Sequence, residues 1–115
     1  MLVAALLYIC YMVIQELEKE IISRLRILNP NKIILFGSLA YGNPDRNSDL
    51  DLCIVTDSNI SKSEMKRKVR SLLHGISIAK DILTPTIDEY TFYKNEVGSV
   101  YKEIDRKGKV LWESS

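Results

Sequence analysis

The sequence predicts an α/β (α+β) fold with a small mixed β-sheet flanked by helices. Short apolar segments rich in β-branched residues alternate with longer segments of helical periodicity. Asn-Pro, Gly-Ser and Asp-Ser-Asn sequences separate them, and such sequences are typical of turns. At 115 residues, with 46% apolar and 27% charged residues, the chain is typical of one globular domain. Its formal net charge of +1 gives no general attraction for nucleic acid.

The first fourteen residues, MLVAALLYICYMVI, form an apolar segment before a domain that we place at 15–115. The segment lacks the basic start and cleavage site of a signal peptide, and it is shorter than the ~20 residues that span a bilayer. We expect a buried helix start that packs on the domain or on a partner. The alternatives are an upstream extension specific to this chain or a membrane anchor. We therefore expect a homo- or hetero-oligomer and no membrane association.

The first half of the domain is predicted to be a helix followed by two strands. Apolar residues recur at spacings of three and four, as on one face of a helix: Ile14, Leu17, Ile21, Leu25 and Leu28. Pro30 ends this helix, because the residue before a proline is disfavoured in the α region. The segments KIILF at 32–36 and LDLCIV at 50–55 are predicted strands, separated by a loop at 37–48.

The second half is predicted to alternate helices with short strands. Ser61 with Glu64, and Thr86 with Glu89, have the spacing of capping boxes that open helices. The remaining predicted elements are a helix with an apolar stripe of Met65, Val69, Leu72, Leu73 and Ile76, a strand at 77–83, a short helix to about Glu96, a helix at 100–107 closed by Gly108, and a strand at 109–113.

Two aspartates interrupt the second predicted strand. Side chains alternate along a strand, so Asp49, Asp51 and Cys53 share one face, and the leucines between them point to the other, which we expect to be the hydrophobic core. The two carboxylates then lie roughly 6–7 Å apart at their Cα atoms, where their charges repel each other. A divalent cation would relieve this repulsion, and oxygen ligands of this kind suit Mg²⁺. Strand-end or exposed edge charges are the alternative interpretation.

A phosphate-binding turn is predicted next to these carboxylates. Gly37 permits close approach of the backbone to a ligand, and Ser38 adds a hydroxyl donor. Asp81, in the apolar segment IAKDIL, is the candidate third carboxylate, either as a metal ligand or as a general base. The alternative for Asp81 is an ion pair with Lys80 or another exposed cation. A phosphate-binding turn beside metal-binding carboxylates is typical of enzymes that catalyse phosphoryl or nucleotidyl transfer.

The segment IILFGSLAYGNPDRNSDLDLCIV carries a family resemblance. Gly37-Ser38, ten intervening residues and Asp49-x-Asp51 resemble the signature of the DNA polymerase β nucleotidyltransferase superfamily. The surrounding sequence and the tail DEYTFYKNEVGSVYKEIDRKGKVLWE are similar to the minimal nucleotidyltransferases of bacteria and archaea. The likeness extends from about residue 15 to residue 115. It implies the nucleotidyltransferase fold.

The resemblance implies roles for individual residues. Gly37 and Ser38 would bind the nucleotide triphosphate, and the three aspartates would be catalytic and would bind two Mg²⁺ ions. Many relatives have an arginine where this chain has Tyr41, and Arg46 is a candidate substitute for it at the phosphates. Ser48 is grouped with the nucleotide-binding residues, although we expect it to shape the loop or bond a carboxylate rather than react.

The resemblance also implies a partner and a reaction. Minimal members are often paired with a small helical HEPN-domain toxin, and some transfer AMP from ATP to a tyrosine of that toxin, as antitoxins. We therefore expect a Mg²⁺-dependent protein adenylyltransferase. The alternatives are a non-catalytic module that neutralises a HEPN toxin by masking it, and a small-molecule nucleotidyltransferase, whose usual second domain is missing from these residues.

The remaining features carry weaker signals. Cys10 and Cys53 form neither a disulfide framework nor a Cys-x-x-Cys metal site, which favours reduced thiols in the cytoplasm. Lys62, Lys66 and Arg70 are basic residues at helical spacing, interpreted as a solvated face or alternatively as a patch for a partner. No aromatic residue interleaves them, so binding of single-stranded nucleic acid is not indicated.

Overall fold

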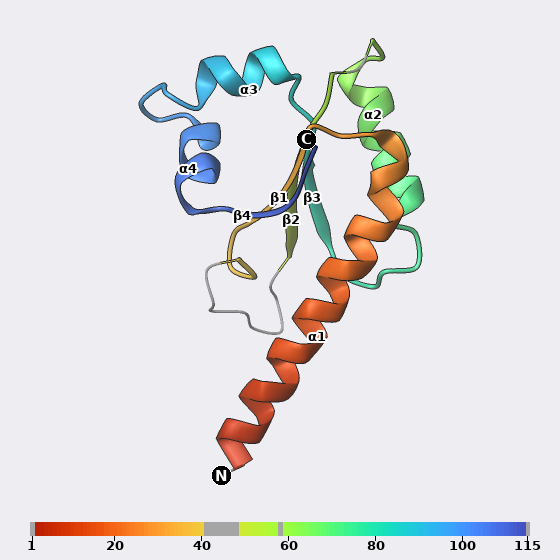
Figure 1. Cartoon of the computed structure of the whole chain (residues 1–115), viewed down its shortest axis with the longest axis vertical. Coiled ribbons are helices and arrows are strands. Elements are labelled where there is room, and N and C mark those ends of the chain that lie inside the picture. Colours follow the sequence, from red (N-terminus) through yellow and green to blue (C-terminus); the bar gives the residue numbers. More distant parts are fainter. Residues whose placement is uncertain (1, 41–48, 58, 115) are drawn as a thin grey trace.

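The protein forms a mixed sheet with two helices on each face (Figure 1). The computed structural model describes residues 2–40, 49–57 and 59–114, with side chains described from residue 12 onward. The α/β (α+β) prediction is confirmed. In chain order the elements are α1 (Leu2–Leu25), the 3₁₀ helix η1 (Arg26–Leu28), β1 (Lys32–Phe36), β2 (Leu50–Val55), α2 (Lys62–Leu72), β3 (Lys80–Leu83), α3 (Ile87–Tyr93), α4 (Val100–Lys107) and β4 (Lys109–Glu113).

The strand order of the sheet is β3-β2-β1-β4. β1 pairs antiparallel with both β2 and β4, and β2 pairs parallel with β3. The parallel pair requires a crossover connection, which α2 provides. The predicted strands at 32–36, 50–55 and 109–113 have the observed bounds.

The first face of the sheet packs against α1 and α2. Leu50, Leu52 and Ile54 of β2 are fully buried there, which confirms that this side of the strand is core. Met65 and Val69 of α2 are buried against the same cluster, as the predicted stripe requires. The other buried members are Ile21, Leu25, Ile33, Leu35, Leu73 and Ile82.

The second face of the sheet carries a smaller core beneath α3 and α4. Cys53 and Val55 lie in it beside Tyr90 of α3 and Ile104 of α4. The prediction of a core on one face only was therefore wrong: the face that holds Asp51 also holds the fully buried Cys53. The reason is that α3 and α4 cover the part of this face that holds Cys53 and Val55. They do not fully cover the part that holds Asp51, which is half-buried.

The first half of α1 extends away from the sheet (Figure 1). Met12 and Val13 are exposed on it, whereas Ile21 and Leu25 are buried under the sheet. Within the described residues, neither α1 nor any other helix combines the length and apolar character needed to cross a membrane. The division into 1–14 and 15–115 stays a prediction.

Arg24 joins the end of α1 to the end of α2. Its guanidinium group donates hydrogen bonds to the carbonyl oxygens of Leu72 (3.2 Å) and His74 (2.7 Å). Leu72 is the last residue of α2, where carbonyls have no intrahelical partner, and His74 lies in the turn that follows. Asn29 then ends η1 in the left-handed conformation, with φ of 50°. Together these contacts fix the direction in which the chain enters β1.

Several predicted helix and strand ends differ from the structure. α2 ends at Leu72, before Leu73 and Ile76 of the predicted stripe. The third strand begins at Lys80, whose ammonium group donates hydrogen bonds to the carbonyls of Ile76 and Ile78 in the irregular segment before it. α3 ends at Tyr93, and turns follow it. Gly108 follows α4 with an extended backbone (φ −68°) instead of the left-handed cap. Glycine is needed there because a Cβ would lie 2.5 Å from the Ile104 carbonyl oxygen.

Candidate active site at the end of the sheet

Asp51 and Asp81 lie side by side on neighbouring parallel strands. They are register partners in β2 and β3, so their Cα atoms are about 4.8 Å apart. The next pair in the same register, Cys53 and Leu83, belongs to the second core. Side chains two residues apart point to the same face, so both carboxylates lie on the α3/α4 face. The structure therefore brings together two residues that are thirty positions apart in the sequence.

Asp49 lies immediately before β2 and is exposed. The strand begins at the buried Leu50, whose amide donates a hydrogen bond to the carbonyl of Ala79 (2.8 Å). The pKa of the Asp51 carboxyl is raised by burial first, and then by the negative charges of Asp81 and Asp49. All three predicted carboxylates therefore contribute to one region of negative potential at this end of the sheet.

Gly37 follows β1 directly and lies against the Asp51 carboxylate. Its φ is 77°, and a Cβ at this position would lie 2.0 Å from Oδ2 of Asp51. The carbonyl of Gly37 accepts a hydrogen bond from the amide of Ala40 (3.0 Å), which closes a turn that contains Ser38. The sequence predicted a glycine for close approach to a ligand, whereas the structure shows close approach to a carboxylate of the same site.

The ion pair considered for Asp81 is not formed with Lys80. The Lys80 ammonium group donates hydrogen bonds to the carbonyls of Ile76 (2.6 Å) and Ile78 (2.9 Å). Asp81 itself is exposed, and no ion pair joins it to another residue in the described part of the chain. Its carboxylate is therefore available to a ligand or to a reacting group.

Three predicted positions lie outside the described residues. These are Tyr41 and the two candidate nucleotide-binding residues, Arg46 and Ser48. Their roles stay predictions. The candidate site in the described structure therefore consists of the turn at Gly37 and Ser38 together with the three aspartates.

The donor atoms of this site suit a hard cation. All three predicted ligands are carboxylates, and burial, followed by the negative charges of Asp81 and Asp49, raises the pKa of Asp51. Across residues 2–40, 49–57 and 59–114, however, no group of three or more Asp, Glu, His or Cys side chains has the spacing of a metal site. The set fits Mg²⁺ in chemistry and charge, and binding of two ions stays a prediction.

The family assignment follows from the whole domain. The family profile of the nucleotidyltransferase domain matches residues 14–111, which include β1, β2, β3, the turn and all three aspartates. The chain belongs to the nucleotidyltransferase family. This agrees with the resemblance carried by Gly37, Ser38 and the Asp-x-Asp pair. A sequence search among curated proteins gave no match to this nucleotidyltransferase.

Two solved structures share the fold of this nucleotidyltransferase. One is described as a toxin–antitoxin with AMP-PNP, with 24% sequence identity and a TM-score of 0.61. The other is a mutant of the toxin–antitoxin MntA-HpeT, with 22% identity and a TM-score of 0.57. Each alignment covers 85% of this chain and 74% of the other chain. At this level of identity the likeness shows the fold alone.

Proposed function

We propose that this nucleotidyltransferase transfers AMP from ATP to a hydroxyl group of a partner protein in a toxin–antitoxin pair. The observation that carries the proposal is the contact of Gly37 with Asp51, beside Asp81 on the next strand. It puts a turn suited to phosphate next to carboxylates suited to a cation. ATP contains both chemical groups that such a site would recognise, in the form of its Mg²⁺ complex.

The structural relatives support this choice of substrate and partner. One of them was solved as a toxin–antitoxin with AMP-PNP, an analogue of ATP. The other carries glutamate in place of two aspartates that are separated by a single residue. The same spacing separates Asp49 from Asp51 in this chain. The proposed partner is a small helical HEPN-domain toxin, as the family resemblance of the sequence implies.

Each residue of the site has a proposed role in the transfer. Asp49 and Asp51 would hold Mg²⁺, which neutralises charge on the triphosphate when it is bound. Amide groups of the turn at Gly37 and Ser38 would hold phosphate oxygens. The acceptor hydroxyl oxygen forms a bond to the α-phosphorus as the bond to the pyrophosphate oxygen breaks. Asp81, which is exposed at the edge of this group, would accept the proton of the hydroxyl.

The test is transfer of labelled AMP to the partner. The full chain is incubated with α-labelled ATP, Mg²⁺ and the protein product of the adjacent reading frame. We expect label on that protein, and its loss by at least about a hundredfold in Asp49→Asn. Asp88→Asn is the matched control, because Asp88 is an exposed aspartate in the first turn of α3, and it should transfer normally.

A second measurement separates metal binding from catalysis. Mn²⁺ added in place of Mg²⁺ should broaden the amide NMR signals of Gly37, Asp51 and Asp81 in the wild-type chain, and broaden them far less in Asp51→Asn. A tight complex with the partner but no label from any nucleotide would contradict transfer and favour the masking module. Label on a small molecule alone would favour the alternative of a small-molecule nucleotidyltransferase.

A further inference from the structure

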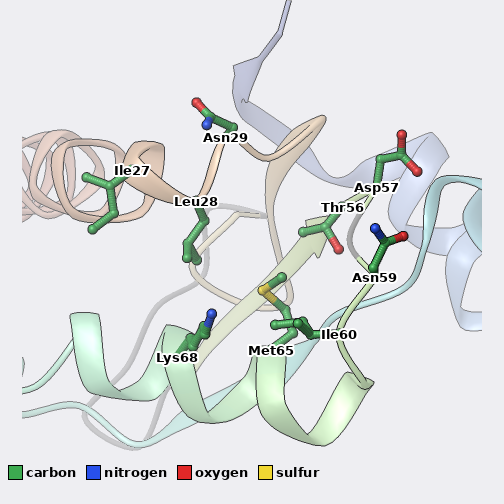
Figure 2. Close-up of a pocket in the computed structure, with 9 residues that line it drawn as sticks. All are labelled: Ile27, Leu28, Asn29, Thr56, Asp57, Asn59, Ile60, Met65 and Lys68. Atoms are coloured by element: carbon green, nitrogen blue, oxygen red, sulfur yellow. The ribbon is translucent and has the colours of Figure 1, made fainter.

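A pocket of about 440 Å³ lies at the end of the sheet opposite to the aspartates (Figure 2). β2 begins beside the candidate site at Leu50 and ends at Val55, next to the pocket residue Thr56. At about 3.3 Å per residue, the strand separates the two places by about 17–20 Å. None of the predicted site residues lines this pocket.

Three segments of the chain form the walls of the pocket, as Figure 2 shows. The 3₁₀ helix η1 and its cap provide one wall, the residues after β2 provide the second, and α2 provides the third. The lining residues are Ile27, Leu28, Asn29, Thr56, Asp57, Asn59, Ile60, Met65 and Lys68. The apolar members come from all three segments, so an apolar group in the pocket would contact each of them.

Backbone hydrogen bonds fix two of these walls. The Asn29 amide donates to the carbonyl of Arg26 (3.0 Å), which holds the end of η1. Thr56 is buried. Its amide donates a hydrogen bond to the carbonyl of Pro85 (3.1 Å), and its carbonyl accepts one from the amide of Ile87 (3.1 Å). The pocket therefore has a preformed shape on these sides, which lowers the entropy that binding would cost.

Ile27 is the apolar residue at the rim of the pocket that the fold does not bury. Its side chain is 67% exposed, although neighbouring Leu28 packs against the first core. Met65, on the opposite wall, is 4% exposed. An exposed isoleucine beside a partly apolar pocket provides surface whose burial would favour binding of an apolar side chain.

The helix α2, which provides one wall of the pocket, is strongly basic as a whole, and Lys68 is its one cation among the lining residues. α2 contains five cationic residues and a single acidic one, Glu64. Lys62 forms an ion pair with Glu89, but Lys66, Arg67, Lys68 and Arg70 form none with the described residues. Lys68 is the cation that lines the pocket. A ligand with an acidic group near an apolar group would therefore be complementary to this face in charge and in polarity.

The composition of the pocket favours a protein segment over nucleic acid. The lining includes no aromatic side chain on which a base could stack. Asp57 adds a negative charge to the rim, which opposes a continuous phosphate backbone but permits a single carboxylate near Lys68. An acidic peptide segment can place a carboxylate near Lys68 and an uncharged residue near Asp57, because its sequence sets where its charges lie.

We propose that this pocket docks an acidic segment of a partner protein. An apolar side chain of that segment enters between Leu28 and Met65 and covers Ile27, and a neighbouring carboxylate pairs with Lys68. The surface is at the opposite end of the sheet from the aspartates, so a docked partner leaves the nucleotide site open. The proposal does not depend on AMP transfer, and it can fail or hold independently of it.

The test is NMR titration of the isotope-labelled full chain with designed peptides of about a dozen residues. The probe peptide contains leucine and phenylalanine three positions apart, flanked by aspartate and glutamate. In one control peptide lysine replaces the acidic residues, and in another serine replaces both apolar residues. We expect the probe to bind with a Kd of about 100 μM and to shift the amide signals of Leu28, Thr56 and Lys68. Both control peptides should bind at least about tenfold more weakly.

Matched variants separate docking from general charge attraction. Lys68→Glu should weaken binding of the probe by at least about tenfold, whereas Lys66→Glu, two positions away on α2 and outside the lining, should weaken it less than about threefold. Ile27→Ser should also weaken binding, with Val97→Ser, at an exposed valine outside the pocket, as its control. All four side chains are at least partly exposed, so the variants are expected to fold, and their spectra check this.

Several outcomes would overturn the proposal. Equal losses in Lys68→Glu and Lys66→Glu would show nonspecific attraction. Shifts confined to residues outside the pocket would place the peptide elsewhere. Absence of binding at about 1 mM peptide would reject the surface, and tighter binding of an oligonucleotide to the same residues would assign it to nucleic acid instead.

Discussion

The Asp51 carboxylate occupies the space where Gly37 would carry a side chain. A Cβ on Gly37 would lie 2.0 Å from Oδ2 of Asp51 and 3.0 Å from its Cγ, which is far inside any normal contact. The turn after β1 therefore packs directly against the Asp51 carboxylate of β2. The absence of a side chain at residue 37 is what allows the phosphate-binding turn and the carboxylate to be adjacent.

Gly37→Ala should damage both the fold and the site. We expect a loss of about 2–4 kcal/mol in the free energy of unfolding, because the methyl group meets Asp51 and φ is positive. Gly98→Ala is the matched control: its φ is 83°, but nothing lies within 4 Å of the added atom, so it should lose only about 1–2 kcal/mol. Urea denaturation measures both values. Equal losses of unfolding free energy in the two variants would show that the clash of the added methyl group with Asp51 does not destabilise the protein.

Asp51→Asn should change how stability depends on pH. The pKa of Asp51 is raised above its ordinary value of 3.8 in the folded protein, so folding favours its protonated form. This contribution to stability is complete below about pH 3.8 and is lost as the pH rises through the folded pKa. Asparagine is neutral at every pH, so it does not lose this contribution. The variant should therefore gain stability relative to the wild type between about pH 4 and pH 7. Urea denaturation at several pH values measures the difference.

A second aspartate variant tests the cause of this pH dependence. Asp81→Asn removes one of the two neighbouring charges and should reduce the effect at Asp51 without abolishing it. A wild-type protein that becomes relatively more stable than Asp51→Asn as the pH rises would contradict the raised pKa.

Cys53 should be unreactive in the folded protein. Its thiol is fully buried, and burial raises its pKa to about 12, so almost no thiolate forms at about pH 8. In a Cys10→Ser background, we expect a disulfide-exchange reagent to modify Cys53 only after denaturant unfolds the chain. The absorbance of the released thiol measures the rate. Rapid modification in native buffer would mean that α3 and α4 do not cover this part of the sheet.

Tyr90→Phe should weaken the contact between α3 and α4. The Tyr90 hydroxyl donates a 2.8 Å hydrogen bond to the carboxylate of Asp105, and burial together with this acidic partner raises the pKa of the tyrosine. Loss of the bond should cost about 1–2 kcal/mol. Tyr93→Phe is the control, because Tyr93 is exposed and should tolerate loss of its hydroxyl. Thermal unfolding measures both, and equal shifts in Tm would contradict the role of the bond.

Much of the local structure could be predicted because it depends on neighbouring residues. The capping box of Thr86 and Glu89 is present as predicted, since both partners lie in one helical turn. Ser61 likewise accepts a hydrogen bond from the amide of Glu64 and begins α2. Strand alternation placed Leu52 in the core and Asp51 on the opposite face. These features need only the period of a strand or helix and short-range hydrogen bonds.

The sequence by itself determined which segments form strands, which residues begin helices and that Asp51 points away from the core face formed by Leu50 and Leu52 of β2. Tertiary structure decided that Asp81 is the register partner of Asp51, that Gly37 meets the Asp51 carboxylate, and that Cys53 lies in a second core. It also assembled the pocket at Lys68 from three separate segments. Register between strands far apart in sequence depends on how α2 crosses over and how both cores pack, and no local pattern encodes those contacts.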